Sequence, residues 1–318
     1  MRHTFGGIDA VYTWVYGADP EFQQKLEHYR KMEALPGDPF VAGARRFRDS
    51  DELRYSLRSL ETNAPWINRV FLVTNGQVPR WLKKDHPRLR LVTHREIFPQ
   101  SDHLPTFNSA AIEAHLHRIP GLSRRFLYLN DDVFFGSPVA REDFLPRSGR
   151  QKIWVEPWTL PQSLTEGNLV SRWLGYNHHL LEAAFAGRTF PSLAHTPVLF
   201  DRVMIDDLQA KWPVEFERTS AMRFRTDKMV LLHVLYAHFH AARNGCELAT
   251  VNADDYQFVM FDPPLEKSID KLATVKRLRP KFFCINDDWD GDGQIKDTVL
   301  TEFFENYFPV PSSFERDP

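Results

Sequence analysis

A short apolar run that ends in consecutive carboxylates is the feature that most constrains the fold of this 318-residue chain. Residues 126–130 read FLYLN, and Asp131 and Asp132 follow directly. A short run of aromatic and aliphatic side chains that ends in turn-forming residues predicts a buried strand. In open α/β sheets, ligands bind beyond the carboxyl ends of the strands. The run therefore predicts a sheet that presents carboxylates at a ligand-binding edge.

The same pattern recurs along the chain and predicts the fold class. Further strands are predicted at residues 8–15 (IDAVYTWV), 69–74 (RVFLVT), 89–93 (LRLVT) and 281–285 (KFFCI), with helical stretches between the first ones. Strands that alternate with helices favour an α/β fold, a Rossmann-like mixed sheet with flanking helices. We expect a single domain over residues 1–318, in which residues 191–318 complete the core that residues 1–150 begin.

Helical periodicity indicates where the flanking helices begin. Leucines at positions 53, 57 and 60 share one face of a helix that starts near Asp51, and Asp49 and Glu52 read as its capping pair. A second helix is predicted to open at Asn108 or Ser109, and a long apolar one to cover 227–243. Prolines and glycines break this rhythm over about 155–190. We therefore expect a helical or irregular insertion at 151–190, serving as a lid or acceptor segment.

Charge and cysteine content exclude some classes of protein. The 40 basic and 42 acidic side chains give a formal charge of −2, which is too balanced for a nucleic-acid binder. Cys246 and Cys284 lie among apolar residues and are expected to be buried, reduced thiols. The amino terminus lacks a signal-peptide pattern, and no apolar run approaches the roughly 20 residues of a transmembrane span. We expect a cytoplasmic location and leave open a peripheral association with the inner face of the membrane.

The carboxylates at the strand end suit a hard divalent cation. Mg²⁺ or Mn²⁺ prefers one or two carboxylates together with the phosphate oxygens of a substrate. A second acidic segment follows the strand at 281–285, and its Asp287 is a candidate to complete the site formed by Asp131 and Asp132. Turn formation alone is the competing interpretation of both segments.

The second acidic segment also shows part of a calcium-loop spacing. Asp288, Asp290 and Asp292 match its positions one, three and five, but position twelve is Val299 rather than glutamate. A solvated Asp/Gly turn explains this segment at least as well.

Arginines that could bind a diphosphate occur in three groups, and histidines on one helix raise the question of zinc. The arginine groups are Arg45-Arg46 with Arg48, Arg54 with Arg58, and Arg223 with Arg225. A solvated helix face is the favoured interpretation for Arg45, Arg46 and Arg58. His233 and His240 lie two turns apart on the 227–243 helix, but no third nitrogen or sulfur ligand has a recognisable spacing, so zinc is the weaker interpretation.

Four ordered blocks of the sequence resemble the conserved regions of the Stealth family, which includes bacterial capsular polysaccharide phosphotransferases and the animal N-acetylglucosamine-1-phosphotransferase α/β subunit. The resemblance covers most of the chain. The blocks are IDAVYTWV; RDSDELRYSLRSLETNAPWINRVFLVTNGQVPRWL with HLPTFNSAAIEAHLHRIPGLSRRFLYLNDDVFFG; HTPVLFDRVMIDDL with FERTSAMRFR; and RPKFFCINDDWD with FFENYFPVPSSFE.

The resemblance implies a GT-A-like form of this fold as a single catalytic domain, in which residues 1–150 carry the nucleotide-sugar and metal region. It also implies a reaction and a set of site residues. An acceptor-sugar hydroxyl attacks the β-phosphorus of a UDP-sugar, such as UDP-GlcNAc or a similar hexose donor, and UMP leaves. The implied metal ligands are Asp131, Asp132 and Asp287. Expected donor-binding residues are Tyr12, Thr13, Trp14, Val15, Arg54, Asn75, Asn108 and Asn130. The expected catalytic residues are Asp132, Arg225, and His103 or His195 as proton acceptor.

Departures from the family pattern keep other functions open. Tyr16 replaces the Asp or Asn of W-V-[DN]-G, and Met222 replaces the histidine of TS-x-H-x-x-R. One alternative is a metal-dependent glycosyltransferase that attacks the anomeric carbon and releases UDP. Another is a pseudoenzyme that binds the nucleotide sugar without turnover. The sequence indicates neither the acceptor nor the oligomeric state.

Overall fold

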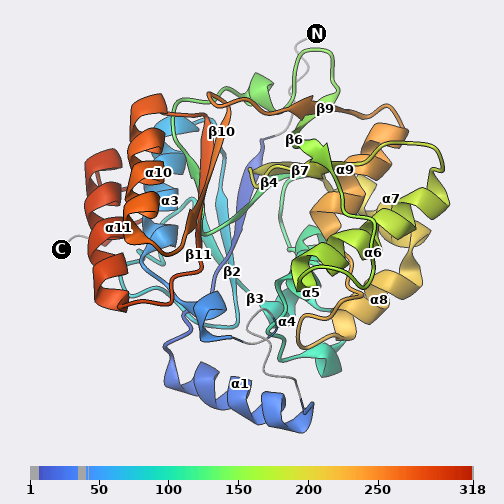
Figure 1. The fold of residues 1–318 in the computed structure, drawn as a ribbon, viewed down its shortest axis with the longest axis horizontal. Helices are drawn as coiled ribbons and strands as arrows, with labels where there is room; N and C mark the ends of the chain where they lie inside the picture. Colours follow the sequence, from blue (N-terminus) through green and yellow to red (C-terminus); the bar gives the residue numbers. More distant parts are fainter. Residues whose placement is uncertain (1–6, 35–40, 42, 317–318) are drawn as a thin grey trace.

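The computed structural model describes residues 7–34, 41 and 43–316, and a mixed five-stranded sheet lies at its centre (Figure 1). The strand order is β3-β2-β1-β4-β8. The first four strands are parallel, and β8 runs antiparallel to β4. Their bounds are β1 (Asp9–Thr13), β2 (Val70–Thr74), β3 (Leu89–Thr93), β4 (Arg125–Asn130) and β8 (Val198–Asp201). The predicted Rossmann-like mixed sheet is confirmed.

Two smaller three-stranded sheets extend this framework. One has the order β10-β11-β5 and the other β7-β6-β9. The first contains β5 (Val133–Phe135), β10 (Tyr256–Phe261) and β11 (Phe282–Asp287), and the second β6 (Gln151–Thr159), β7 (Pro191–Leu193) and β9 (Cys246–Thr250). The segment 151–190, expected to be helical or irregular, thus begins with a strand that is central to a sheet before it forms helix α6.

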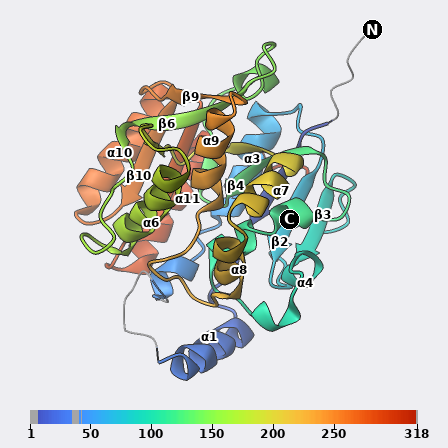
Figure 2. The same ribbon diagram turned by 90° about the vertical axis from the view of Figure 1, so that its right-hand side faces the viewer.

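Helices flank the sheets on both sides. In Figure 1, α3, α10 and α11 lie on one side, α6 to α9 on the other, and α1 lies apart below the sheet; Figure 2 shows the same arrangement from the side of α7 and α8. The helices are α1 (Pro20–Met32), α3 (Glu52–Asn63), α4 (His94–Ile97), α5 (Ser109–Glu113), α6 (Leu169–Ala184), α7 (Arg202–Lys211), α8 (Pro213–Ala221), α9 (Leu232–Ala242), α10 (Leu265–Leu278) and α11 (Gly293–Tyr307).

Helix α9 begins five residues later than the expected start at 227. The preceding segment is not helical because the side chain of Asn177 accepts a hydrogen bond from the backbone N–H of Leu231 at 2.9 Å and donates one to the carbonyl of Met229 at 3.0 Å. Side-chain contacts from α6 therefore fix this segment as a connection between α8 and α9.

Strand alternation explains why the central sheet is buried on both faces. Val11 and Phe71 point into one hydrophobic cluster, whereas Tyr12 and Leu72, one residue further along each strand, point into another. Successive side chains of a strand face opposite sides, so each strand fills both clusters. Near-continuous apolar runs are typical of parallel strands covered by helices on both faces.

A polar stripe on α3 holds β5 in place directly after the Asp131-Asp132 pair. Ser56 donates to the carbonyl of Val133 at 2.5 Å, and Asn63 donates to that of Phe135 at 2.7 Å. The hydroxyl of Ser59 accepts from the N–H of Phe135 at 3.0 Å. Buried backbone groups need such partners, so α3 acts as a hydrogen-bonding neighbour for this short strand.

The other polar face of α3 is also buried, contrary to the expectation of a solvated Arg58. The Arg58 side chain is 3% exposed, and it contacts Glu315 at 2.8 Å and Glu305 at 3.3 Å. Arg58 also donates to the carbonyl of Phe308 at 2.8 Å. The chain after α11 returns over this face, so the arginine is enclosed by residues about 250 positions away.

The structure also bears on the cysteine and membrane expectations. Cys246 and Cys284 are buried free thiols, as predicted. Within residues 7–34, 41 and 43–316, no helix has the length and apolar character required to cross a bilayer.

Candidate active site

The carboxyl ends of the four parallel strands form one edge, and two adjoining cavities lie along it. Thr13 pairs in register with Asn130 on one side and Val73 on the other, and Thr74 pairs with Thr93. The smaller cavity, of about 140 Å³, lies beyond β1 and β4, and the larger, of about 870 Å³, lies beyond β2 and β3. They share the wall residues Phe22, Asn75, His94, Thr106 and Phe107.

Arginines line one part of the smaller cavity. Arg46 and Arg225 each have a buried Nε atom without a hydrogen-bond partner. Burial, together with the neighbouring Arg225, lowers the pKa of Arg46 well below its usual value, and burial lowers that of Arg225 to about 10. Two buried guanidinium groups side by side favour an anion between them, because it relieves both desolvation and repulsion.

Asp131 also lines the smaller cavity. Burial, followed by the charges of Asp132, Glu52 and Asp49, raises the pKa of Asp131 well above the usual range. Burial and neighbouring acids also raise the pKa of Glu52 to about 8 and that of Asp49 to about 6, although Lys296 offsets part of the rise at Glu52. The acids are thus only partly balanced by positive charge, and a bound cation would supply the remainder.

Asp132 has a different set of neighbours from Asp131. Its carboxylate, the His195 imidazole and the Cys284 thiol each offer a ligand atom within 4.8 Å of the others. One oxygen of Asp132, Oδ1, is buried without a hydrogen-bond partner. The two adjacent carboxylates therefore have different neighbours: Asp131 lines the smaller cavity, and Asp132 lies beside His195.

Asp287 does not join either group. Its carboxylate contacts Arg48 Nε at 3.0 Å and Lys296 Nζ at 2.7 Å, and it accepts from the N–H of Trp289 at 2.9 Å. Because two cations already balance Asp287, we correct the prediction of a common metal site with Asp131 and Asp132. The residue instead fixes Arg48, which lines the smaller cavity.

The residues considered for calcium and zinc sites make contacts within the protein that explain their positions. Asp292 caps α11 by accepting from the N–H of Gln294 at 2.8 Å. His233 contacts Glu113 at 3.3 Å, whereas His240 is buried against Tyr236. These contacts agree with the turn and core interpretations.

Several residues predicted to bind the donor do line the cavities. Thr13, Trp14, Val15, Asn75, Asn130, Asp131 and Arg225 all border the smaller cavity. Arg46, which was expected to lie on a solvated face, borders it as well; the side chain of Arg45 lies outside the described residues.

Other predicted donor-binding and catalytic residues do not line either cavity. Tyr12 is fully buried with its hydroxyl on Ser56, so its side chain has no surface for a ligand. Arg54 turns away from the cavities and contacts Glu315 at 2.5 Å. Asn108 is fully buried, and it caps α5 by accepting from the N–H of Ala110 at 3.1 Å.

His103 belongs to a buried hydrogen-bond network. Its Nδ1 lies 2.8 Å from the hydroxyl of Ser220, and Nε2 of His115 lies 2.7 Å from the same oxygen. The side chain is 8% exposed. This network joins the 101–108 loop to α8, which is a structural role, and leaves His195 as the histidine next to a candidate catalytic carboxylate.

Asp49 and Glu52 are the site residues that sequence reasoning missed. They were interpreted as a helix cap, but α3 begins at Glu52 after Asp51, which has a φ of 64° and makes no side-chain capping bond. A signal was present, because Glu52 shares the spacing of the polar stripe formed by Ser56, Ser59 and Asn63. Polar residues that recur on one helical face and are buried indicate a polar neighbour, here the segment that carries the aspartates.

The residues around the strand end fit a divalent cation. Asp131 with its neighbouring acids supplies hard oxygen ligands, and Asp132 adds an oxygen that has no other partner. Cys284 offers a soft sulfur atom, which Mg²⁺ and Mn²⁺ do not favour, so we assign the cation to the oxygen ligands. Oxygen-preferring Mg²⁺ or Mn²⁺ matches this set better than zinc.

Comparison with protein families identifies the class. The models of Stealth conserved regions 1, 2, 3 and 4 match residues 6–34, 46–153, 194–242 and 273–318 in that order. The chain belongs to the Stealth family. The candidate site draws on all four regions, with Val15 from the first, Asp131 from the second, Arg225 from the third and Asp287 from the fourth.

Characterised relatives support the same grouping. The chain is 38% identical to an exopolysaccharide phosphotransferase of Streptomyces coelicolor (97% of this chain, 52% of the relative) and 33% identical to the capsular polysaccharide phosphotransferase SacB of Neisseria meningitidis serogroup A (99% and 58%). It thus spans little more than half of their length. Among solved structures, the galactosyltransferase LgtC in complex with donor and acceptor sugar analogs has a TM-score of 0.43 at 12% identity (96% of this chain, 98% of LgtC).

Proposed function

We propose that the chain transfers a sugar-1-phosphate from a UDP-sugar to a hydroxyl of a saccharide acceptor and releases UMP. The reaction would serve capsular or cell-surface polysaccharide synthesis, as the names of its relatives suggest. The observation that carries this proposal is the smaller cavity at the carboxyl edge of the sheet, which Arg46, Arg225 and Asp131 all line. Arginines and a hard carboxylate in one cavity suit a metal-bound diphosphate.

The arrangement assigns a role to each charged group. The Arg46 and Arg225 guanidinium groups bind the diphosphate oxygens and stabilise the negative charge that gathers on them during transfer. Asp131 and Asp132 would hold Mg²⁺ or Mn²⁺, which neutralises the diphosphate when bound. The acceptor oxygen forms a bond to the β-phosphorus while the bond between that phosphorus and the oxygen bridging to the α-phosphorus breaks, so the electron pair leaves with UMP.

Removal of the acceptor proton falls to His195 in this proposal. The imidazole lies within 4.8 Å of the Asp132 carboxylate, and histidine is the usual proton acceptor near neutral pH. The position that holds a histidine in the family motif is Met222, whose sulfur accepts from the hydroxyl of Thr226 at 3.2 Å. Its thioether cannot accept a proton at neutral pH, so this chain relies on another base.

We infer that the segment 151–190 contacts the acceptor. Strand β6 pairs with β7 at Val155 and Leu193, and the carbonyl of Trp154 accepts from the N–H of Ala194, the residue before His195. Trp158, on the same strand, is 59% exposed. An exposed indole next to a catalytic region suits a sugar ring, whose apolar face stacks on aromatic side chains. We therefore assign this segment to acceptor binding within a single catalytic domain.

The nucleotide product tests the proposal directly. The protein is incubated with UDP-GlcNAc, Mg²⁺ and a panel of saccharide acceptors, and nucleotides are separated by chromatography. We expect UMP and a phosphodiester signal in the phosphorus NMR spectrum. Release of UDP instead would establish a glycosyltransferase and contradict the proposal.

Binding without turnover on any acceptor would favour the pseudoenzyme alternative. In that case the Met222→His variant, which restores the family residue, is the informative one. Turnover gained by this variant alone would show that the natural chain has lost its base.

A further inference from the structure

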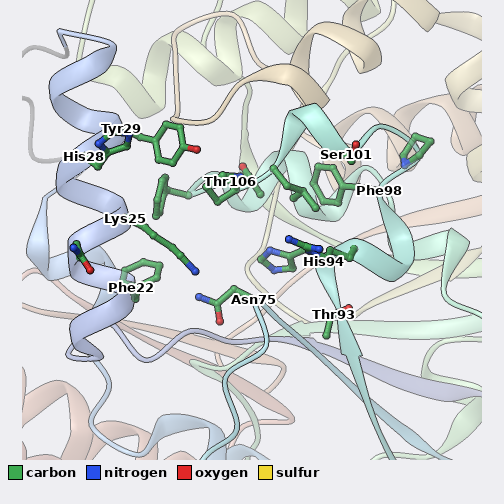
Figure 3. Close-up of a pocket in the computed structure, with 16 residues that line it drawn as sticks. Phe22, Lys25, His28, Tyr29, Asn75, Thr93, His94, Phe98, Ser101 and Thr106 are labelled. Atoms are coloured by element: carbon green, nitrogen blue, oxygen red, sulfur yellow. The ribbon is translucent and has the colours of Figure 1, made fainter.

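The larger cavity has the shape and chemistry of a ligand site, but the reaction just proposed does not assign it. Its volume of about 870 Å³ falls within the roughly 300–1,000 Å³ that ligand pockets occupy. Figure 3 shows side chains of α1 facing the ends of β2 and β3 across this space, with Lys25 and Tyr29 on one side and Asn75 and His94 on the other.

We propose that the larger cavity binds the nucleoside half of the donor, an assignment that rests on the proposed function. A nucleotide sugar consists of three parts in sequence: nucleoside, diphosphate and sugar. The smaller cavity, with Arg46 and Arg225, takes the diphosphate, and the larger cavity adjoins it through five shared wall residues. The remaining question is which end of the donor the larger cavity holds.

In-line displacement answers this question. The attacking and leaving oxygens lie on opposite sides of the phosphorus in phosphoryl transfer. The attacking hydroxyl is expected beside His195, next to Asp132 after β4. The leaving UMP must then extend the other way, past β1 toward β2 and β3. The larger cavity lies at that end of the strand order β3-β2-β1-β4-β8.

The lining of the larger cavity suits a base and a ribose. Tyr29, Phe98 and Phe107 line the cavity with aromatic rings, on which bases stack in other proteins. Arg223 lies over one face of Tyr29 at 4.5 Å and Phe224 stacks on Phe107, so a base would stack on the face of Tyr29 opposite Arg223. Asn75 and Thr106 supply amide and hydroxyl groups for the base edge or ribose hydroxyls.

Two basic side chains complete this lining. Burial lowers the pKa of His94 to about 4, so the imidazole is neutral and offers a donor and an acceptor. The Lys25 side chain points into the cavity in Figure 3, and its ammonium group pairs with Glu21 at 2.6 Å. We expect a bound α-phosphate to compete with Glu21 for this ammonium group.

An acceptor saccharide is the rival occupant. It would need to reach the β-phosphorus from the same side as the leaving nucleotide, which in-line geometry forbids. It would also place the acceptor hydroxyl away from His195. In-line geometry and the position of His195 therefore favour the nucleoside as the occupant of the larger cavity. Binding of the acceptor there is one outcome that the experiment distinguishes.

Binding of UMP, measured by titration calorimetry with Mg²⁺, tests the assignment without requiring an acceptor. Tyr29→Ala and Lys25→Glu should each weaken UMP binding at least tenfold, and Tyr29→Phe, which keeps the ring, should largely restore it. Arg30→Ala is the matched control, because Arg30 is exposed on the same helix and pairs with Glu27. We expect Arg30→Ala to bind UMP like the natural chain.

The outcomes separate this inference from the proposed function. UMP binding by the natural chain that neither Tyr29→Ala nor Lys25→Glu weakens would overturn the nucleoside assignment alone. A rise in the acceptor KM in these variants, with UMP binding unchanged, would identify the larger cavity as the acceptor site. A natural chain that binds neither UMP nor UDP would overturn the proposed function together with the inference.

Discussion

Two groups of buried charges, on different sides of helix α3, contrast in how they are balanced. At the matched group, Arg54 and Arg58 surround Glu315, and hydrogen bonds from Arg58 and Arg54 outweigh burial and lower the pKa of Glu315 to about 2. At the like-charge group, Asp131 lies near Glu52 and Asp49, and burial and repulsion raise their pKa values. In the matched group, the positive and negative charges balance one another. In the like-charge group, the acids are not fully balanced by the protein, which favours a bound cation.

The largest expected effect is on catalysis at Asp132. Asp132→Asn should lower kcat by about a thousandfold or more, because it removes a charge that faces the reacting groups. The thermal midpoint should stay within a few degrees of that of the natural chain, since the substitution preserves shape. The measurement is UMP release, with thermal unfolding alongside. Full activity in this variant would remove Asp132 from the site.

A substitution in the matched group should have the opposite effect: it should lower the stability of the protein and leave catalysis unchanged. Glu315→Gln should lower the free energy of unfolding by about 3 kcal/mol at pH 7, because it removes the buried charge that pairs with Arg58 and leaves only the more exposed Glu305 as an acidic partner. Glu302→Gln, exposed on α11, is the control. Urea unfolding measures both, and kcat of the folded fraction should be unchanged. A loss of kcat without a loss of stability would place Glu315 in the active site.

The pH dependence of that stability sharpens the same comparison. The pKa of Glu315 is lowered in the folded state, so its contribution is present above the unfolded value of about 4.5 and is lost as pH falls toward 2. The difference in unfolding free energy between the natural chain and Glu315→Gln should therefore shrink between pH 5 and about pH 2. A difference that stays constant over this range would show that the ion pair is not its source.

Arg225 tests the cationic part of the smaller cavity. Arg225→Met should lower kcat/KM by about a hundredfold, a typical loss for one group that stabilises transition-state charge. Stability should change little, since removal of a buried cation next to Arg46 offsets the lost contact with Ser109. Steady-state kinetics measure the change in kcat/KM, and thermal unfolding measures the change in stability. Large destabilisation with normal kinetics would make Arg225 a structural residue.

The smallest effect is a gain in stability at Glu52. In EDTA, Glu52→Gln should raise the free energy of unfolding by about 1 kcal/mol at pH 8, because it removes a buried acid whose pKa is raised to about 8. Activity with Mg²⁺ should fall. Lower stability in EDTA would show that the carboxylate is already balanced within the protein.

Apolar patterns predicted the strands of the central sheet well, because the strands are buried on both faces and carry uninterrupted apolar runs. The polar face of α3 was predicted poorly. Arg58 lies opposite the leucine stripe, which indicates solvent by periodicity alone, but the segment after α11 covers it. Local sequence does not reveal a neighbour 257 residues away.

The candidate site shows the same limit. Asn130 and Asp131 were predicted from their position at a strand end, and Thr13 from the family resemblance; topology brings all three to one edge. Arg46 and Glu52 were missed because their roles depend on burial against residues distant in sequence. Asp287 was expected to bind metal because its strand ends in the same way as β4, but Arg48 and Lys296 already neutralise it.

The different neighbours of Asp131 and Asp132 make spacing at the end of β4 unusually consequential. Both residues lie in the turn that joins β4 to β5. Insertion or deletion of one residue there would shift a carboxyl group relative to the strand that positions it, and that group would no longer meet its neighbours. Length, more than residue identity, is thus the property that natural variation at this junction should preserve.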